Sequence, residues 1–338
     1  MIERCEQAAV TLQPGAEAYA ANELSRTGLV KGVEAWLEDG VALVNPQGGF
    51  PALAAAFREQ PPVFIRHICP CALRMAGPEE LAAAVETLAP GLDRGRSFSL
   101  QLRLLGGTAE RYVRHELLRA LSQPLEAAGY RLDARKPEQV ISLTVAPGAC
   151  YAGLSPAADN LSDWAGGNCH FRQPGMISRA EGKLLEAFDL FQPALPAGGR
   201  ALDLGAAPGG WTRVLRERGF TVTAVDPALL HPSLAGDPGV THCRMTAQAF
   251  FAQKPAPFDL LVNDMRMDAL LSARLMGVSA AHLAPGATAV MTLKLVHAGA
   301  QKQVRQVLAL LGQWYEIVAV RQLFHNRSEV TAVLRRKA

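Results

Sequence analysis

The sequence predicts an α/β protein that ends in a doubly wound, Rossmann-like sheet. Apolar runs alternate with helical patterns through residues 178–338, as expected of strands that alternate with helices. A glycine-rich turn joins the apolar run Ala201–Leu204 to a helical pattern that begins at Trp211, and Asp226 follows the next apolar run. A strand, a tight turn, a helix and an acid after the second strand are the parts of a nucleotide-binding unit.

The length and composition allow two or three globular domains. The chain has 338 residues, of which 49% are hydrophobic and 19% are charged, so sizeable cores are expected in a soluble protein. A net charge of +3 is too small to indicate nucleic-acid binding by itself. Arginine-rich segments at residues 111–119 and 335–337 still allow local basic patches.

The cysteine pattern indicates reduced thiols and predicts no metal site. No pair has the C-x-x-C spacing, and Cys69-Pro-Cys71 is too close for the usual zinc spacing. The N-terminus lacks a basic segment followed by an apolar run, and no apolar stretch reaches the length of a membrane span. We therefore expect a cytoplasmic protein without membrane contact. The six cysteines are Cys5, Cys69, Cys71, Cys150, Cys169 and Cys243.

Residues 1–70 are predicted to form a ferredoxin-like N-terminal domain. Strands are expected at residues 9–12, 33–37, 41–44 and 63–68, and helices at residues 14–27 and 51–60. The resulting order, βαββαβ, is that of the ferredoxin-like arrangement.

Residues 71–160 are predicted to form a second α/β domain, followed by a linker at 161–177. Helices are expected at 78–88 and 109–128, and strands at 97–105, 140–145 and 150–154. The stretch Leu132–Leu143, LDARKPEQVISL, resembles the C-terminal part of THUMP domains, which accompany RNA-modifying enzymes and bind RNA. An ordinary polar turn before an apolar strand is the other interpretation. Both domains lack a glycine fingerprint, which favours binding or positioning roles.

Residues 178–338 carry the predicted catalytic sheet. Its first helix is expected from Ser178 to Phe191, with Ser178 as N-cap and Glu181 completing a capping box. The further strands are expected at residues 201–204, 221–225, 258–263, 287–295, 315–321 and 329–334. The further helices are expected at residues 211–218, 248–251, 270–283 and 300–311.

The glycine turn favours S-adenosylmethionine (SAM) over a dinucleotide. The dinucleotide fingerprint needs three glycines, and Ala207 stands where the middle one belongs, between Gly205 and Gly210. Pro208 removes a backbone donor from the loop, which makes a pyrophosphate cradle less suitable. Asp226 would then accept from the hydroxyls of the SAM ribose. A turn that needs glycine only for its own geometry is the structural alternative.

Two charged residues at strand ends are candidates for catalysis. Asp264 ends the apolar strand at 258–263, and Lys294 interrupts the apolar run Val290–Val296. Ligands of doubly wound sheets gather at the carboxyl ends of the strands, and an unpaired ammonium in an apolar strand is costly. A helix cap for Asp264 and a strand-end lysine reaching solvent for Lys294 are the structural alternatives.

Four residues then form a recognisable pattern, Lys183, Asp264, Lys294 and Glu329. Their types and order resemble the Lys-Asp-Lys-Glu tetrad of the FtsJ-like RNA ribose 2′-O-methyltransferases, and the turn DLGAAPGGWT resembles the glycine motif of that family. With the THUMP-like segment and the tail FHNRSEVT, the whole chain resembles the members that act on bacterial large-subunit ribosomal RNA.

The resemblance implies SAM as cofactor and a set of residues that bind it. The position of a family aspartate falls by spacing on Thr246, whose hydroxyl could face the adenine region without charge. The expected cofactor-binding residues are Ser178, Gly205, Ala207, Pro208, Gly209, Gly210, Asp226, Thr246 and Asp264.

The chemistry of the tetrad can be argued from the residues. A ribose hydroxyl is a poor nucleophile until its proton leaves, so a positioned base is needed. We expect Lys294 to be that base, because burial and a nearby cation such as Lys183 favour loss of its proton. Asp264 and Glu329 oppose that loss but orient the lysine. Lys183 is expected to steer the hydroxyl or a neighbouring phosphate.

The resemblance also implies substrate and partners. It implies formation of 2′-O-methylcytidine in the peptidyl-transferase region of 23S ribosomal RNA, before subunit assembly is complete, by a monomer. Two alternatives remain: methylation of another substrate such as transfer RNA or a base nitrogen, and a non-catalytic RNA-binding module. The sequence Asn263-Asp264-Met265-Arg266 lacks the Pro-Pro-aromatic motif typical of base N-methylation, and the complete tetrad argues against a dead module.

Overall fold

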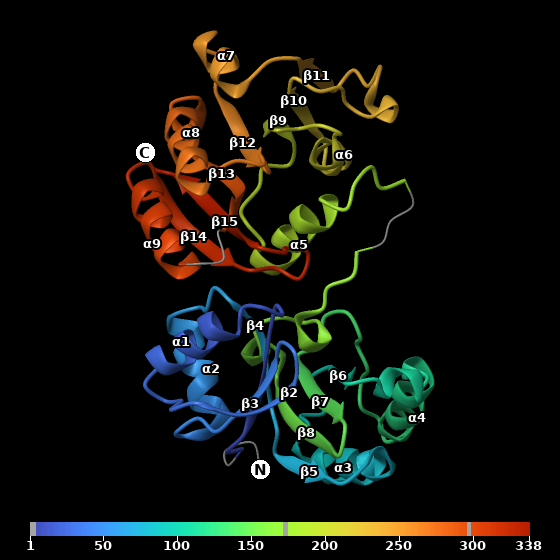
Figure 1. The fold of residues 1–338 in the computed structure, drawn as a ribbon. Coiled ribbons are helices and arrows are strands. Elements are labelled where there is room, and N and C mark those ends of the chain that lie inside the picture. The colour runs from blue at the N-terminus through green and yellow to red at the C-terminus, as the bar shows by residue number, and fades with distance from the viewer. Residues whose placement is uncertain (1–4, 172–174, 296–298) are drawn as a thin grey trace. The chain divides into compact units, whose positions relative to one another are not determined.

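The computed structural model describes residues 5–171, 175–295 and 299–338. The chain divides into two compact units, Met1–Cys169 (unit 1) and His170–Ala338 (unit 2), as drawn in Figure 1. Within the described ranges, unit 1 contains two four-stranded sheets and unit 2 contains a seven-stranded sheet.

The first sheet of unit 1 has the predicted βαββαβ order. Its strands lie in the order β2-β3-β1-β4, and each neighbouring pair is antiparallel. All five residues of β1 are buried, because this strand lies between two others and under two helices. The elements are β1 (Ala8–Leu12), α1 (Glu17–Arg26), β2 (Val33–Glu38), β3 (Val41–Val44), α2 (Gly49–Glu59) and β4 (Ile65–Pro70).

The second sheet of unit 1 has the order β5-β8-β7-β6, with β6 and β7 parallel. The predicted helix at 109–128 is shorter than expected: it begins at Arg114 after a separate 3₁₀ turn at Thr108–Glu110. The three-residue strand β5 was not predicted, because so short a run carries no periodicity. The elements are β5 (Leu73–Met75), α3 (Leu81–Leu88), β6 (Phe98–Leu104), α4 (Arg114–Ala127), β7 (Gln139–Ala146) and β8 (Ala149–Pro156).

The segment that follows β8 packs onto unit 1 as far as Cys169. It contains 3₁₀ turns at Ala157–Asn160 and Ala165–Gly167, and the Gln101 side chain donates to the Asp163 carbonyl over 2.6 Å. The expected domains at 1–70 and 71–160 and the linker at 161–177 stay predictions. Residues 172–174 of that linker lie outside the described residues.

Unit 2 confirms the predicted doubly wound sheet. The strand order is β11-β10-β9-β12-β13-β15-β14; the first five strands are parallel, and β15 is antiparallel to both neighbours. The strands are β9 (Gly199–Leu204), β10 (Phe220–Val225), β11 (Val240–Cys243), β12 (Phe258–Asn263), β13 (Leu283–Lys294), β14 (Tyr315–Arg321) and β15 (Glu329–Arg336). The helices are α5 (Glu181–Phe191), α6 (Gly210–Glu217), α7 (Ala247–Ala252), α8 (Ala269–Ala280) and α9 (Ala300–Leu311).

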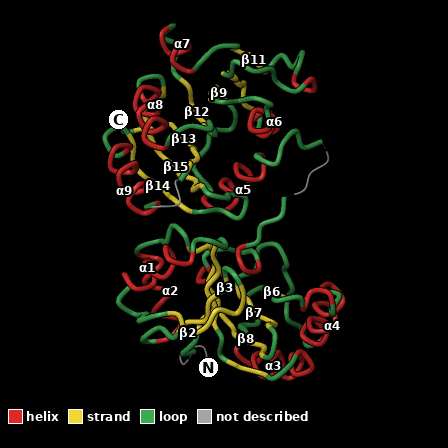
Figure 2. The backbone as a smooth tube through the Cα atoms, viewed as in Figure 1, coloured by secondary structure: helices red, strands yellow, loops and turns green. Residues whose placement is uncertain are grey.

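Helices cover both faces of the seven-stranded sheet. Helices α5 and α6 pack together on one face, and α8 and α9 pack together on the other, as Figures 1 and 2 show. A core of buried apolar residues from α5, α6 and the central strands includes Leu184, Trp211 and Val262. Because β9, β10 and β12 are parallel, their carboxyl ends meet at one edge of the sheet.

The strand register places the candidate site residues together at that edge. Leu204 pairs with Val225 on one side and with Asn263 on the other. The glycine turn, Asp226 and Asp264 each follow one of these three paired residues. On the neighbouring strands, Lys294 pairs directly with Glu329.

The predicted cap of helix α5 is only half correct. The Glu181 carboxylate accepts from the backbone N–H groups of Ile177 and Ser178, at 2.6 and 3.1 Å, which is the return half of a capping box. The Ser178 hydroxyl does not cap the helix, and α5 begins at Glu181 with Ala180 as N-cap. The Glu181 side chain is held in this position because its second oxygen also pairs with Arg213 of α6. That oxygen lies 3.0 Å from Arg213 Nε and 2.9 Å from Arg213 Nη2.

The structure also bears on the cysteines, on metal sites and on membrane-spanning helices. All six cysteines are unpaired, and all but Cys243 are buried. Among the described residues, no three His, Cys, Asp or Glu side chains are grouped as metal ligands. Within the same ranges, no helix has the length and apolar character needed to cross a membrane.

Glu181→Ala should destabilise unit 2 by about 3–5 kcal/mol, because it removes the buried carboxylate that two backbone N–H groups and Arg213 share. The matched control is Glu217→Ala, which removes the other carboxylate paired with Arg213. The Glu217 side chain is 42% exposed whereas that of Glu181 is fully buried, so the control should cost less than about 1 kcal/mol. Urea unfolding followed by circular dichroism measures both, and equal losses would contradict this account.

Candidate active site

The glycine turn after β9 needs glycine at two positions for steric reasons. Gly205 and Gly209 have φ of +73° and +108°, which side chains rarely adopt. A Cβ at Gly205 would lie 2.6 Å from the Met265 side chain, and one at Gly209 would lie 2.3 Å from the Leu234 side chain. Glycine is therefore required at both positions by the backbone conformation of the turn and by the side chains that pack against it.

Asp226 follows β10 and faces this turn. One of its carboxylate oxygens accepts from the Ala207 N–H over 3.1 Å, and the other accepts from the Ala228 N–H over 2.8 Å. Each oxygen keeps a further lone pair that can accept from a hydroxyl. Its place beside the turn suits a bound ribose, as the sequence predicted.

Ser178 lies against the other end of the turn. A Cβ at Gly210 would be 2.4 Å from the Ser178 hydroxyl oxygen, so glycine is needed for this close approach. The hydroxyl oxygen is buried and has no hydrogen-bond partner among the described residues. A buried, unpartnered hydroxyl beside a cofactor turn fits the predicted contact with SAM.

Pro208 and Thr246 complete the predicted cofactor set. The Pro208 carbonyl accepts from the His231 N–H over 2.8 Å, which ties the turn to the loop after Asp226. Thr246 is exposed and serves as the N-cap of α7, its hydroxyl oxygen accepting from the Ala249 N–H over 3.2 Å. That bond uses one of the two lone pairs of the oxygen, so the hydroxyl can still donate its hydrogen to a ligand and accept one further hydrogen bond.

Asp203 is a residue of this edge that sequence reasoning missed. It lies in β9, 1% exposed, and accepts from the Thr212 hydroxyl of α6 over 2.7 Å. Burial raises the pKa of Asp203 to about 7; the Thr212 hydrogen bond opposes this rise, and the charges of Asp264 and Asp226 add to it. The signal was an acid inside an apolar strand directly before the glycine turn.

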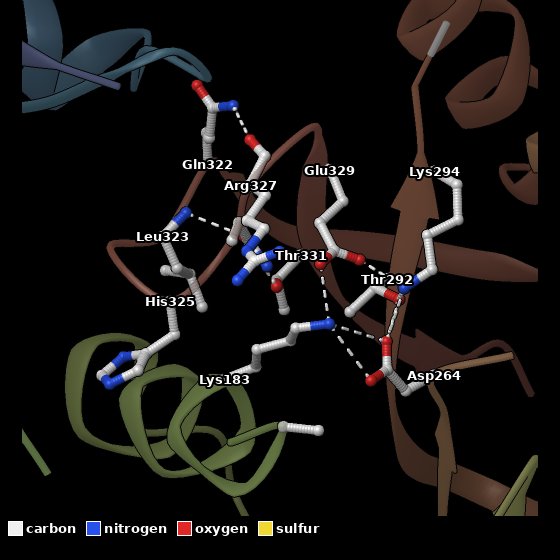
Figure 3. A network of polar contacts seen from close by, with 12 residues as sticks. Lys183, Asp264, Thr292, Lys294, Gln322, Leu323, His325, Arg327, Glu329 and Thr331 are labelled. Carbon is white, nitrogen blue, oxygen red and sulfur yellow. Dashed lines mark hydrogen bonds and ion pairs between the residues drawn. The ribbon is translucent and has the colours of Figure 1, made fainter. Parts of the chain in front are cut away.

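The four residues of the predicted tetrad form one closed ring, shown in Figure 3. The Lys183 ammonium contacts both oxygens of Asp264 at 3.2 Å and Glu329 Oε1 at 2.7 Å. The Lys294 ammonium contacts Asp264 Oδ1 at 2.7 Å and makes a short ion pair with Glu329 Oε2. Two lysines from α5 and β13 thus alternate with two acids.

Thr292 is a fifth member of the ring that the sequence analysis did not name. Its hydroxyl donates to Asp264 Oδ1 over 2.6 Å and accepts from the Lys294 ammonium over 2.9 Å. It stands two residues before Lys294 in β13, so the strand period of two places both side chains on the same face. That spacing was the available signal.

The electrostatics of the ring differ from the sequence-based expectation. Burial lowers the pKa of Lys294, but Asp264 and Glu329 outweigh it through their charge and hydrogen bonds, so the pKa is raised above 10.5. We expected burial and Lys183 to favour loss of the proton. In the free protein the acids prevail, and Lys294 is an ammonium at neutral pH.

Comparison with known proteins identifies the class. The profile of the FtsJ-like methyltransferase family matches residues 176–330, which include the glycine turn and all four tetrad residues. The chain is 38% identical over 193 residues to ribosomal RNA large subunit methyltransferase M of Halorhodospira halophila, covering 56% of this chain and 55% of that protein. It is 32% identical over 295 residues to the protein of that name from Thauera aminoaromatica, covering 81% and 79%.

These alignments differ in extent. The first relative is matched over about half of its own length, whereas the Cellvibrio japonicus protein of the same name is matched over 97% of its length at 29% identity. The profile match places residues 176–330 in the FtsJ-like methyltransferase class. Within that class, the chain belongs to the ribosomal RNA large subunit methyltransferase M family.

Asp226→Ala should weaken SAM binding by about 1–3 kcal/mol, or roughly 5- to 150-fold in Kd, because the ribose hydroxyls lose their acceptors. Isothermal titration of the full chain measures this. Asp259→Ala is the control: this acid is in the second position of β12, at the opposite end of the sheet, and accepts from the Arg200 N–H. Unchanged SAM affinity in Asp226→Ala would contradict the assignment.

Asp203→Asn should remove a pH dependence of stability. The folded state holds the Asp203 proton up to about pH 7, whereas the unfolded chain releases it near its ordinary pKa of 3.8. Folding therefore binds a proton between these values, and the stability from Asp203 falls as pH rises from about 4 to 7. Melting curves should show a smaller fall for Asp203→Asn, which keeps an acceptor for Thr212. Identical slopes in the two proteins would contradict the raised pKa.

Proposed function

We propose that this protein transfers a methyl group from SAM to a ribose 2′-hydroxyl of RNA, in 23S ribosomal RNA and at a cytidine of the peptidyl-transferase region. The observation that carries the proposal is the closed ring of Lys183, Asp264, Lys294 and Glu329 beside the glycine turn. Membership of the ribosomal RNA large subunit methyltransferase M family supports the choice of RNA.

SAM supplies an electrophilic methyl carbon to a nucleophile held in line with it. The protein has to orient the ribose hydroxyl and accept its proton. Lys294 donates to Asp264, Glu329 and Thr292, so the three ammonium hydrogens are all in use. An incoming hydroxyl therefore has to replace one acceptor, and the neutral Thr292 hydroxyl is the one whose loss costs least.

The raised pKa sets a condition on the base role that we propose for Lys294. Its ammonium must first give a proton to solvent, and only the resulting amine can take the proton of the hydroxyl. Asp264 and Glu329 then hold the amine in place. The role expected for Lys183 changes as well, because its ammonium is engaged by both acids and is only 13% exposed. We assign it to fixing Asp264 and Glu329, not to steering a phosphate.

One alternative is disfavoured by a specific contact. Enzymes that methylate a base amino group typically use a motif that begins with Asn or Asp at the end of the fourth strand, and Asn263, the last residue of β12, is the candidate here. Its side chain is fully buried, donates to the Ser272 hydroxyl over 3.2 Å and accepts from the Met265 N–H over 3.0 Å. With both ends of the amide in use, it is not available to a substrate base.

Unit 1 is proposed to bind the RNA substrate in the cytoplasm, before subunit assembly is complete, and the enzyme to act as a monomer. The exposed basic residues of α4, of the turn before it and of the THUMP-like segment support this role. Phosphate contacts from such side chains weaken as salt rises. These residues are Arg111, Arg114, Arg119, Arg135 and Lys136.

The function is tested with ribosomal RNA from cells that lack the gene. Purified protein and SAM should methylate 23S ribosomal RNA from such cells, and mapping should place one ribose methyl group on a cytidine of the peptidyl-transferase region. The same RNA from cells that retain the gene should accept little. Transfer RNA as the better substrate, or methylation of a base, would overturn the proposal.

Lys294→Arg and Lys294→Ala should both slow single-turnover methylation by about 100-fold or more at neutral pH. Arginine keeps the charge but does not readily lose a proton, and alanine removes both charge and base. SAM affinity should stay within about twofold in both. Lys302→Ala, an exposed lysine of α9, is the control and should keep full activity. Activity of Lys294→Arg within about threefold of wild type would leave Lys294 as a positioning residue.

The pH profile gives an independent check of the base. With a pKa raised above 10.5, the fraction of neutral Lys294 grows about tenfold for each pH unit through the neutral range. The wild-type single-turnover rate should therefore rise from pH 7 to 9 without levelling. A plateau below pH 8 would show that another group limits the step.

A further inference from the structure

The tetrad leaves RNA phosphates without a cationic partner at the site. Its two ammonium groups face two carboxylates at 3.2 Å or less, so the ring as a whole carries no net charge. A ribose in RNA lies between two phosphates, and its position is set mainly by contacts to the backbone. A cation outside the ring is required to hold such a phosphate.

The loop that joins β14 to β15 is built as a rigid support next to the ring. The Gln322 side chain, 4% exposed, donates to the Arg327 carbonyl over 2.9 Å. The Asn326 side-chain oxygen, in a residue 1% exposed, accepts from the Leu323 N–H over 2.8 Å. These contacts tie the side chains to the loop backbone, although Gln322 Oε1 and Asn326 Nδ2 are buried without a hydrogen-bond partner among the described residues.

Helix α5 holds the same loop from the other side. The Glu186 carboxylate, 5% exposed, accepts from the N–H groups of Phe324 and His325 at 2.8 and 3.0 Å and contacts His325 Nδ1 at 2.7 Å. The His325 ring lies directly on Gly182, where an added Cβ would be 2.3 Å from it. Lys183 follows Gly182, so one turn of α5 positions both the ring of four charged residues and the loop between β14 and β15.

Arg327 is the cation that this loop presents. It is exposed, two residues before Glu329, and its guanidinium has no hydrogen bond or ion pair among the residues that the structure describes. Its backbone is held by two hydrogen bonds, because the Gln322 side chain donates to the Arg327 carbonyl and the Leu295 N–H donates to the Ser328 carbonyl over 2.9 Å. The side chain extends from the loop toward the region of Lys183 and Glu329 (Figure 3).

We infer that Arg327 binds a backbone phosphate of the RNA next to the target ribose, and that Glu186 and His325 position the loop that presents it. The inference rests on the proposed function, since it takes RNA as substrate. A guanidinium suits this task because it stays charged and can donate two parallel hydrogen bonds to one phosphate. Arg327 thereby supplies the contact that the neutralised ring cannot.

The test compares Arg327→Ala with Arg274→Ala, which removes an exposed arginine of α8 that is likewise without a partner among the described residues. Arg327→Ala should raise the KM for RNA about tenfold, with kcat changed less than threefold and SAM affinity unchanged. The slope of log Kd for RNA against log salt concentration should become shallower by about 0.7–0.9, as expected for one lost phosphate contact. Arg274→Ala should match wild type in all four quantities.

The positioning role of Glu186 is tested by combining a substitution at Glu186 with Arg327→Ala in one protein. Glu186→Gln replaces one acceptor oxygen by a donor, so it should displace the loop and raise the KM for RNA in the same way. Adding Arg327→Ala to it should then raise KM less than about twofold further, whereas independent effects would multiply. SAM titration confirms that each variant is folded.

Three failures can be told apart. If wild type methylates RNA and Arg327→Ala retains its KM and salt slope, the phosphate assignment is wrong while the proposed function stands. If wild type methylates no RNA, the proposed function itself has failed. If the KM increases of Glu186→Gln and Arg327→Ala multiply in full in the double variant, Arg327 binds phosphate without help from the loop contacts. The positioning role of Glu186 is then wrong.

Discussion

Mutual neutralisation of four charges that are buried or partly buried is the constraint on which the rest of unit 2 depends. Lys183, Asp264, Lys294 and Glu329 come from α5, the end of β12, β13 and β15, and none of their side chains is more than 27% exposed. Removing one charge would leave its partners buried and uncompensated, which costs far more than a surface ion pair contributes. The four elements are therefore held at the distances that the ion pairs require, and the cofactor turn is built on the adjoining strand.

The same attraction has a chemical consequence that works against reactivity. Two carboxylates that allow an ammonium to be buried also hold its proton, so the geometry that places Lys294 also keeps it charged. Position and basicity are thus in opposition at this site. An enzyme can accept that opposition when most of the rate comes from holding two reacting atoms in line, because a small fraction of neutral amine then suffices.

The sequence was sufficient for most of the elements and for which charges meet, but it missed the short strands β5 and β11 and did not show how each charge is shared. The strand β12 was predicted with its observed bounds, Phe258–Asn263, because an apolar run this short, flanked by polar residues, favours a strand over a helix. The start of α5 was misplaced because Ser178 and Glu181 have the spacing of a capping box. The carboxylate of Glu181 serves Arg213 as well, a contact made 32 residues away. Likewise the hydrogen bonds of Glu186 reach residues 138 and 139 positions ahead, which no local pattern encodes.

Helix α5 joins the two halves of the site. Glu181 at its first turn holds the backbone before the helix and Arg213 of α6, close to the glycine turn. Lys183 reaches the ring of charges, and Glu186, one turn later, holds the loop that leads into Glu329. Position 181 lies on the opposite side of the helix from positions 183 and 186, which are three residues apart and share a face, so one rigid element fixes three parts of the sheet edge at once. A displacement of α5 would therefore disturb the glycine turn, the ring of charges and the loop between β14 and β15 together. Although α5 is not part of the sheet, it sets the relative positions of these three features.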